Sequence, residues 1–125
     1  MRRTRCYIAG PISKGDVEQN VRNACNAFTE LGKAGYAPFA PQLTCYLQGP
    51  TASVSAGFDH DEWMAMDLPW VEVADCVLRL PGESVGADME VEHARLAGVP
   101  VFYSISELVS KNYNRRGHAS DDDGE

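Results

Sequence analysis

The sequence predicts a three-layer α/β fold built around a mainly parallel sheet of four to five strands. Short apolar runs alternate along the chain with longer segments whose apolar residues recur every three or four positions. Most of these segments end at Gly or Pro, which are typical of turns between elements. Strands that alternate with helices in this way form a parallel sheet with helices on both faces and right-handed crossovers.

The first half of the chain has the pattern of a strand–helix–strand unit followed by an irregular segment. Gly10-Pro11 interrupts the first apolar run, and Gly35 follows the helical spacing. A loop as long as the irregular segment is more often functional than idle in a compact domain. The expected elements are a strand over 5–9, a helix over 16–34, a strand over 36–40 and a loop over 42–59.

The second half continues the alternation, and its strongest strand signal is the nearly continuous apolar run DCVLRL. Helical spacing precedes this run, but Pro69 lies inside the helical pattern and predicts a kink or a restart there. The expected elements are a helix around 63–71, a strand over 75–80, a helix over 84–97, a strand over 99–104 and a short helix over 104–111.

Length and composition fit one globular domain. Of the 125 residues, 44% are hydrophobic and 23% are charged, which is typical of soluble proteins. We assign residues 1–111 to a single α/β domain and residues 112–125 to a flexible acidic tail. No apolar run approaches the roughly 20 residues that a membrane span needs, and the first residues lack the pattern of a signal peptide. We therefore expect a cytoplasmic protein that contacts no membrane.

The charges and the metal-binding residue types exclude two classes of function. The formal net charge is −7, and four of the acidic residues lie in the last five positions. The rest of the chain is nearly neutral, so we expect no nucleic acid polymer as a partner. The four cysteines and three histidines lack the spacing of metal ligands, which predicts reduced, buried thiols and no zinc site.

Two loops follow predicted strands at the edge of the sheet where open parallel sheets bind ligands. One is AGPISKG at 9–15, in which Ser13 and Lys14 could meet a phosphate. The other, PGESVG at 81–86, leads into a helix N-terminus, whose free N–H groups favour an anion. Ordinary turn geometry and ordinary surface residues would explain both loops equally well.

Glu90 is the carboxylate that the helical pattern singles out. At 100° per residue it falls inside a narrow stripe of small or apolar residues. Burying a carboxylate there is costly, and such groups cluster at functional sites. The alternative is a glutamate at the edge of the stripe that reaches water or pairs with an arginine. The stripe consists of Ala87, Val91, Ala94, Ala97 and Gly98.

Asp67 presents a similar choice, because it lies four residues after Trp63 on the apolar face of its segment. It could be a second carboxylate of the site or the cap of a helical segment that restarts at Pro69, and a cap would not exclude a role in the site. Trp63 could stack on a planar ligand together with Phe58 and Tyr46, although aromatic residues at helical spacing are more often part of the core.

Three segments resemble the nucleoside 2-deoxyribosyltransferase superfamily: YIAGPIS at 7–13, DLPWVEVADCVLRLPGES at 67–84 and SVGADMEVEHARLAGVPV at 84–101. The last contains the complete pattern S-x-G-A-x-x-E-x-x-x-A-x-x-x-G-x-P-V. The similarity extends from residue 5 to about 104, and it is strongest to a small, uncharacterised branch similar to the 2′-deoxynucleoside 5′-phosphate N-hydrolases. It implies a flavodoxin-like or Rossmann-like fold, no metal or organic cofactor, a nucleotide or nucleoside as small-molecule partner, and a homodimer or larger homo-oligomer.

The resemblance also implies an activity, because both reactions known in the superfamily cleave an N-glycosidic bond. The catalytic glutamate of the pattern corresponds to Glu90, which would act as the nucleophile, and an assisting aspartate corresponds to Asp67. Six residues before the nucleophile, enzymes acting on free nucleosides have Asp and the monophosphate hydrolases have Ser, and this chain has Ser84. The implied binding residues are Tyr7, Gly10, Ile12, Ser13, Lys14, Trp63, Ser84 and Gly86.

The expected function is therefore N-glycosidic cleavage of nucleoside 5′-monophosphates, with 2′-deoxy sugars expected, through a covalent glycosyl-Glu90 intermediate. The products would be the free base and the sugar phosphate. The alternatives are a 2-deoxyribosyltransferase that exchanges bases on free deoxynucleosides and a non-catalytic nucleotide-binding module. Two positions depart from the hydrolase pattern: Ser13 stands where those enzymes have Arg, and Pro69 follows Asp67.

Overall fold

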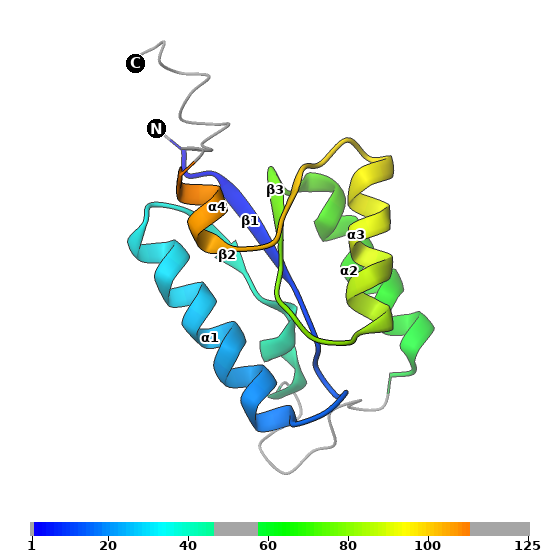
Figure 1. Cartoon of the computed structure of the whole chain (residues 1–125). Coiled ribbons are helices and arrows are strands. Elements are labelled where there is room, and N and C mark those ends of the chain that lie inside the picture. The colour runs from blue at the N-terminus through cyan, green and yellow to red at the C-terminus, as the bar shows by residue number, and fades with distance from the viewer. Residues whose placement is uncertain (1, 47–57, 111–125) are drawn as a thin grey trace.

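A four-stranded, all-parallel sheet forms the middle layer of the molecule (Figure 1). The computed structural model describes residues 2–46 and 58–110. The order of the strands is β2-β1-β3-β4, which confirms the predicted parallel α/β fold and gives the sheet four strands. Their bounds are β1 (Arg5–Ala9), β2 (Ala37–Phe39), β3 (Cys76–Arg79) and β4 (Val101–Phe102).

Two pairs of helices cover the two faces of this sheet (Figure 1). On one face α1 (Val17–Lys33) and α4 (Ile105–Ser110) pack on the sheet, and on the other face α2 (His60–Val73) and α3 (Val85–Leu96) do. A short 3-10 helix, η1 (Pro41–Tyr46), follows β2. No helix among the described residues is both long enough and apolar enough to span a membrane.

The side chains of β1 alternate between the two faces, as expected of a strand. Cys6 and Ile8 belong to the buried cluster beneath α1 and α4, whereas Tyr7 and Ala9 belong to the cluster beneath α2 and α3. Val77 of β3, which is paired in register with Tyr7, lies in this second cluster. The alternation therefore places the Tyr7 side chain under the two helices that carry Asp67 and Glu90.

Helix α2 differs from the sequence expectation. It begins at a capping box, in which the Asp59 carboxylate accepts from the N–H of Glu62 and the Glu62 carboxylate accepts from the N–H of Asp59. From there it runs without interruption through Pro69, so the predicted restart is wrong and Asp67 is not a helix cap. Pro69 is exposed and removes one backbone donor, whereas Val71, two residues later, is completely buried and packs the helix on the core.

Other expectations are corrected in detail. Strand β4 has only two residues where six were expected, and the first part of the expected loop over 42–59 is η1. Cys6 and Cys76 are buried as expected, but Cys25 on α1 is exposed. The apolar stripe of α3 is buried at Ala87, Val91 and Ala94 and ends before Ala97 and Gly98, which are exposed. Residues 47–57 and the expected tail over 112–125 lie outside the described residues.

Candidate active site

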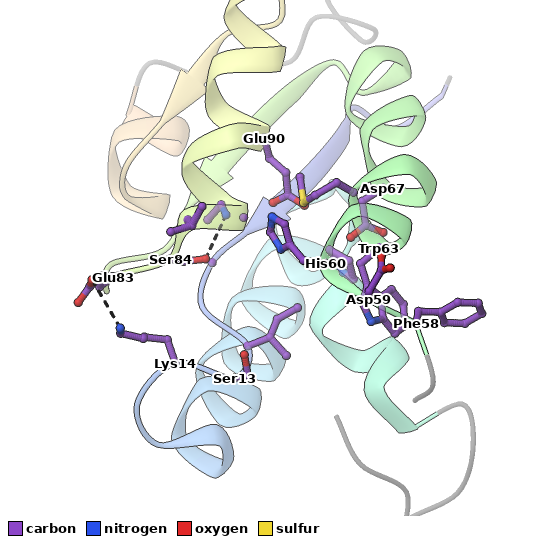
Figure 2. A pocket seen from close by; sticks show the side chains of 17 residues that line it. Ser13, Lys14, Phe58, Asp59, His60, Trp63, Asp67, Glu83, Ser84 and Glu90 are labelled. Atoms are coloured by element: carbon purple, nitrogen blue, oxygen red, sulfur yellow. Dashed lines mark hydrogen bonds and ion pairs between the residues drawn. The ribbon is translucent and has the colours of Figure 1, made fainter. Parts of the chain in front are cut away.

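A cavity of about 470 Å³ opens at the carboxyl ends of β1 and β3 (Figure 2). Its walls come from the loop after β1, the first two turns of α2, and the turn that leads from β3 into α3. Nearly all of the residues expected to bind or transform a substrate meet here. Those that line the cavity are Gly10, Ile12, Ser13, Lys14, Trp63, Asp67, Ser84, Gly86 and Glu90.

The two loops at the floor of the cavity pack directly against each other. A Cβ atom on Gly10 would lie 3.0 Å from the Cβ of Leu80, so a side chain does not fit between the loops. Gly82 has a φ of +116°, and a Cβ there would lie 2.8 Å from Pro11. Only glycine satisfies the backbone conformation and the close approach at this second position. Both glycines are therefore needed to bring the two loops together.

The loop after β1 is held in shape by α1. The Asn20 side-chain amide donates to the carbonyl of Ile12 at 3.0 Å and to the carbonyl of Lys14 at 2.8 Å. At the rim, the Lys14 ammonium lies 3.7 Å from the Glu83 carboxylate, and both side chains are largely exposed (Figure 2). This ion pair joins the two loops across the opening.

Helix α3 begins at the cavity and presents Glu90 to it. Ser84 caps the helix, because its hydroxyl oxygen accepts from the N–H of Ala87 at 3.0 Å (Figure 2). The hydroxyl proton of Ser84 is not used by this bond and is available to a ligand. Six residues later Glu90 lies on the buried face of the helix with only 6% of its surface exposed. The helical stripe thus predicted the burial of Glu90 correctly.

Tyr7 holds Glu90 from below. The Tyr7 hydroxyl donates to Oε2 of Glu90 at 2.6 Å, and this bond is buried. Tyr7 itself is 1% exposed and is not among the residues that line the cavity. Tyr7, which the sequence predicts to be a substrate-binding residue, instead lies beneath α3 and donates to a carboxylate that does line the cavity.

The electrostatic environment keeps Glu90 close to its titration point at neutral pH. Burial raises the pKa of Glu90 to about 7, and the nearby Asp67 carboxylate also raises it. The hydrogen bond from Tyr7 and the charge of Arg79 act in the opposite direction and lower the pKa. Burial and the two carboxylates also raise the pKa of Tyr7 above its ordinary value, so the phenol keeps its proton.

Asp67 faces the same cavity from α2 (Figure 2). It is partly buried, and burial raises its pKa to about 6. Next to it on the same wall, Trp63 contacts Phe58 edge-on, with the ring centroids 5.2 Å apart. Trp63 and Phe58 both line the cavity, whereas the side chain of Tyr46 lies outside the described part of the structure.

Polar residues of this region that the sequence did not single out include Asp59 and Glu83, which line the cavity, as well as His60 and Gln42. His60 lines the cavity, and its ring approaches the position that a Cβ on Gly86 would occupy to 3.7 Å. Its signal was present, since His60 precedes Asp67 by seven residues, or two helical turns, on the same face. Gln42 is only 1% exposed, and neither end of its amide has a hydrogen-bond partner within the described residues. That amide lies against Gly10 at the cavity floor.

Solved structures with this fold include two that cover most of the chain. One is a 2-deoxyribosyltransferase from the psychrotolerant bacterium Bacillus psychrosaccharolyticus, with 22% identity, a TM-score of 0.56, and coverage of 78% of this chain and 69% of that chain. The other is a conserved protein from Enterococcus faecalis V583, with 23% identity, a TM-score of 0.58, and coverage of 97% and 74%. At these identities the similarity establishes the shared fold.

Sequence comparison gives the family. No curated protein matches the chain significantly. Residues 4–103, which include all four strands and every described residue of the cavity, match the family described as a domain of unknown function, DUF4406. The chain therefore belongs to the DUF4406 family.

Proposed function

We propose that this protein cleaves the N-glycosidic bond of a nucleoside 5′-monophosphate, with Glu90 as the nucleophile and Asp67 as the group that assists the leaving base. The observation that carries the proposal is the pair of carboxyl groups on facing helices of one cavity, both with raised pKa. Two carboxyl groups in different protonation states are the usual machinery for glycosidic cleavage. The fold shared with a 2-deoxyribosyltransferase supports this choice.

The first step replaces the bond between C1′ and the base nitrogen by an ester bond between C1′ and Glu90. Since Tyr7 donates to Oε2, the other carboxylate oxygen is the one left to attack C1′. The developing oxocarbenium charge is stabilised by the carboxylate itself. The pKa values of about 7 for Glu90 and about 6 for Asp67 let the two carboxyl groups hold one proton between them near neutral pH. In the reactive state this proton is on Asp67 and Glu90 is ionised, and Asp67 delivers the proton to the departing base, either directly or through water.

The second step releases the sugar. A water molecule attacks C1′, the ester bond to Glu90 breaks, and the water's proton passes to Asp67, which is thereby restored to its acid form. The products are the free base and the sugar 5-phosphate. Trp63 and Phe58 offer an aromatic wall against which a planar base can stack.

The start of α3 suits the 5′-phosphate. Free N–H groups at a helix N-terminus attract an anion, and the Ser84 hydroxyl has a proton to donate there. Lys14 adds a cation at the same rim. A hydroxyl at position 84 accommodates a phosphate, whereas a carboxylate at that point would repel one.

One observation favours the second candidate, a 2-deoxyribosyltransferase acting on free nucleosides. Lys14 is already paired with Glu83, and the cavity is also lined by three further carboxyl groups, those of Asp59, Asp67 and Glu90. This charge balance disfavours a dianion. Under the transferase alternative an added base, rather than water, would take the sugar from Glu90.

The test is a panel of matched substrates. The release of free base is measured for a nucleoside and its 5′-monophosphate, each with ribose and 2′-deoxyribose, with and without a second added base. Charge-assisted hydrogen bonds contribute about 1.5–3 kcal/mol each, so two of them favour the monophosphate by roughly 10²- to 10⁴-fold in kcat/KM. Wild-type preference for the nucleoside, with transfer of its sugar to the added base, would replace the hydrolase by the transferase.

Ser84→Asp is the matched variant for this panel. It places a negative charge where the phosphate is expected but retains a side chain that can cap α3. We expect the monophosphate to lose most of its kcat/KM while the nucleoside is affected much less, so that the preference reverses. Equal losses for both substrates would mean that position 84 does not face the phosphate.

A further inference from the structure

Arg79 is a mostly buried cation at the carboxyl end of β3, and it does not line the cavity. Only 11% of its side chain is exposed. It follows Val77 by two residues, so the alternation along the strand directs it to the face covered by α2 and α3. Its strand neighbour across the sheet is Ala9, the last residue of β1. Arg79 thus lies beneath the beginning of α3.

The guanidinium group joins the turn after β3 to the first turns of α3. It donates to the carbonyl oxygens of Leu80 and Gly82, and it forms a 2.9 Å ion pair with the Asp88 carboxylate. Leu80 and Gly82 both pack against the loop after β1. The shape of the turn that leads to Ser84 therefore depends on Arg79.

The position of this charge is unfavourable for the helix taken alone. The N-terminal end of a helix carries a partial positive charge, so a cation beside it is repelled. Asp88 offsets this repulsion from an exposed position, with 72% of its side chain accessible. A polar, uncharged side chain could satisfy carbonyl groups in the turn without the repulsion. The charge itself therefore calls for an explanation.

We propose that Arg79 is a positioning residue for the nucleophile: it fixes the turn between β3 and α3 and supplies a positive charge, from beneath the helix, that favours Glu90 as a carboxylate. This inference rests on the proposed function only in its kinetic consequences. The charges around Glu90 support it, because Arg79 opposes the effects of burial and of Asp67 on the Glu90 pKa. The other titratable groups facing Glu90 are Tyr7 from β1 and Asp67 from α2, and His60 lines the same cavity.

Two variants that break the same ion pair separate a charge effect from a structural one. Arg79→Met removes the positive charge, whereas Asp88→Asn leaves that charge without its counterion. If Arg79 acts through its charge, the first raises the titration midpoint of Glu90 by about 0.5–1 pH unit and the second lowers it. If the ion pair serves only to hold the helix, both variants reduce stability, and the Glu90 midpoint does not move in opposite directions in the two variants.

The measurement is a carbon-13 NMR titration of the side-chain carboxyl groups in the full-length protein, with Glu90→Gln identifying the Glu90 signal. Arg79→Lys keeps the charge but cannot hold both carbonyls and Asp88 with the same planar group. In Arg79→Lys we therefore expect a Glu90 midpoint close to that of the wild type. The KM for the monophosphate should nevertheless be at least several-fold higher than in the wild type. The acid limb of kcat/KM should move with the NMR midpoint in each variant.

The inference would be overturned if the Glu90 midpoint shifted in the same direction in Arg79→Met and Asp88→Asn. It would also be overturned if the midpoint in Arg79→Met changed by less than about 0.2 pH unit. Should Arg79→Met fail to fold, Asp88→Asn still decides, because an unchanged or raised midpoint in that variant contradicts the proposed charge effect. The titration needs no substrate. A protein that releases base from no member of the substrate panel would refute the proposed function and leave the test of Arg79 intact.

Discussion

Glu90 combines burial with access to a cavity, and its two carboxylate oxygens have different surroundings. Oε2 accepts the 2.6 Å hydrogen bond from Tyr7 beneath the helix. Burial alone would favour the protonated form, and the bond from Tyr7 offsets part of that effect. The arrangement supplies an oriented carboxylate whose remaining oxygen is not committed to a described partner.

Glu90→Gln is expected to abolish nearly all base release while preserving the fold, because the amide matches the carboxylate in shape but cannot form the ester. Circular dichroism and a melting curve check the fold, and release of base from the preferred substrate checks the activity. Glu90→Ala should behave in the same way. Activity within a few-fold of wild type in Glu90→Gln would refute the covalent mechanism.

Tyr7→Phe is the matched variant for the orienting hydrogen bond, since it removes only the hydroxyl. A hydrogen bond to a charged group is worth about 1.5–3 kcal/mol, so we expect kcat to fall by roughly 10- to 100-fold. The KM should change little, because Tyr7 does not line the cavity. A higher KM with unchanged kcat would instead indicate that Tyr7 contacts the substrate.

Gln42 is the buried polar residue that the fold itself does not explain. Both ends of its amide lack a partner in the described part of the chain, and buried groups of this kind are costly. Gln42→Met should therefore stabilise the protein by about 1 kcal/mol or more. Because the amide lies against Gly10 at the cavity floor, we also expect a weaker substrate interaction, seen as a higher KM. Chemical denaturation and steady-state kinetics measure the two effects separately.

At the level of the elements, the regular helical spacing of apolar residues made α3 predictable, whereas a proline inside the helical pattern made α2 harder to predict. The buried stripe of α3 follows the 3.6-residue repeat through Ala87, Glu90 and Ala94. In α2, Pro69 obscured a helix that the capping box and the buried Val71 hold together. The extent of β4 was overestimated because its hydrogen-bonded pairing with β3 covers only Val101 and Phe102, which local apolarity does not reveal.

The continuity of α2 gives Asp67 a place on a helical wall rather than at a cap. Asp67→Asn is therefore expected to leave the melting temperature within a few degrees of wild type. It should slow natural substrates much more than an analogue with an easily expelled base, because only the poor leaving group needs a proton. Asp61→Asn, at an exposed position of the same helix outside the cavity, is the control. Equal slowing of both substrates by Asp67→Asn would contradict leaving-group assistance.

Across the whole molecule, the site is assembled from segments that are distant in the sequence. The loop after β1 and the turn after β3 come together because β1 and β3 are adjacent, parallel and in register from Cys6 and Cys76 onward. The alternation of strands and helices allowed this edge of the sheet to be predicted. The contacts of Gly10 with Leu80, of Tyr7 with Glu90 and of Arg79 with Asp88 depend on tertiary packing, and no local pattern contains them.

The two carboxyl groups of the site also affect the stability of the whole protein, and the direction follows from their raised pKa values. The pKa of Glu90 is about 7 in the folded state and has an ordinary value of 4.5, so the folded state retains a proton that the unfolded chain releases. The contribution of Glu90 to the stability of the folded state is therefore fully present below pH 4.5. This contribution is lost as the pH rises through about 7. Asp67, with a pKa of about 6 against an ordinary 3.8, contributes in the same direction.

We therefore expect Glu90→Gln to be more stable than wild type above pH 7 by on the order of 2–3 kcal/mol, and the advantage should shrink to nearly nothing around pH 4. The measurement is the free energy of unfolding by urea at several pH values, taken as the difference between variant and wild type so that other titrating groups cancel. Glu92→Gln, on the exposed side of the same helix, controls for the general effect of removing a charge and should show no such trend. A constant difference between pH 4 and 8 for Glu90→Gln would mean that the folded state does not hold Glu90 protonated above its ordinary range.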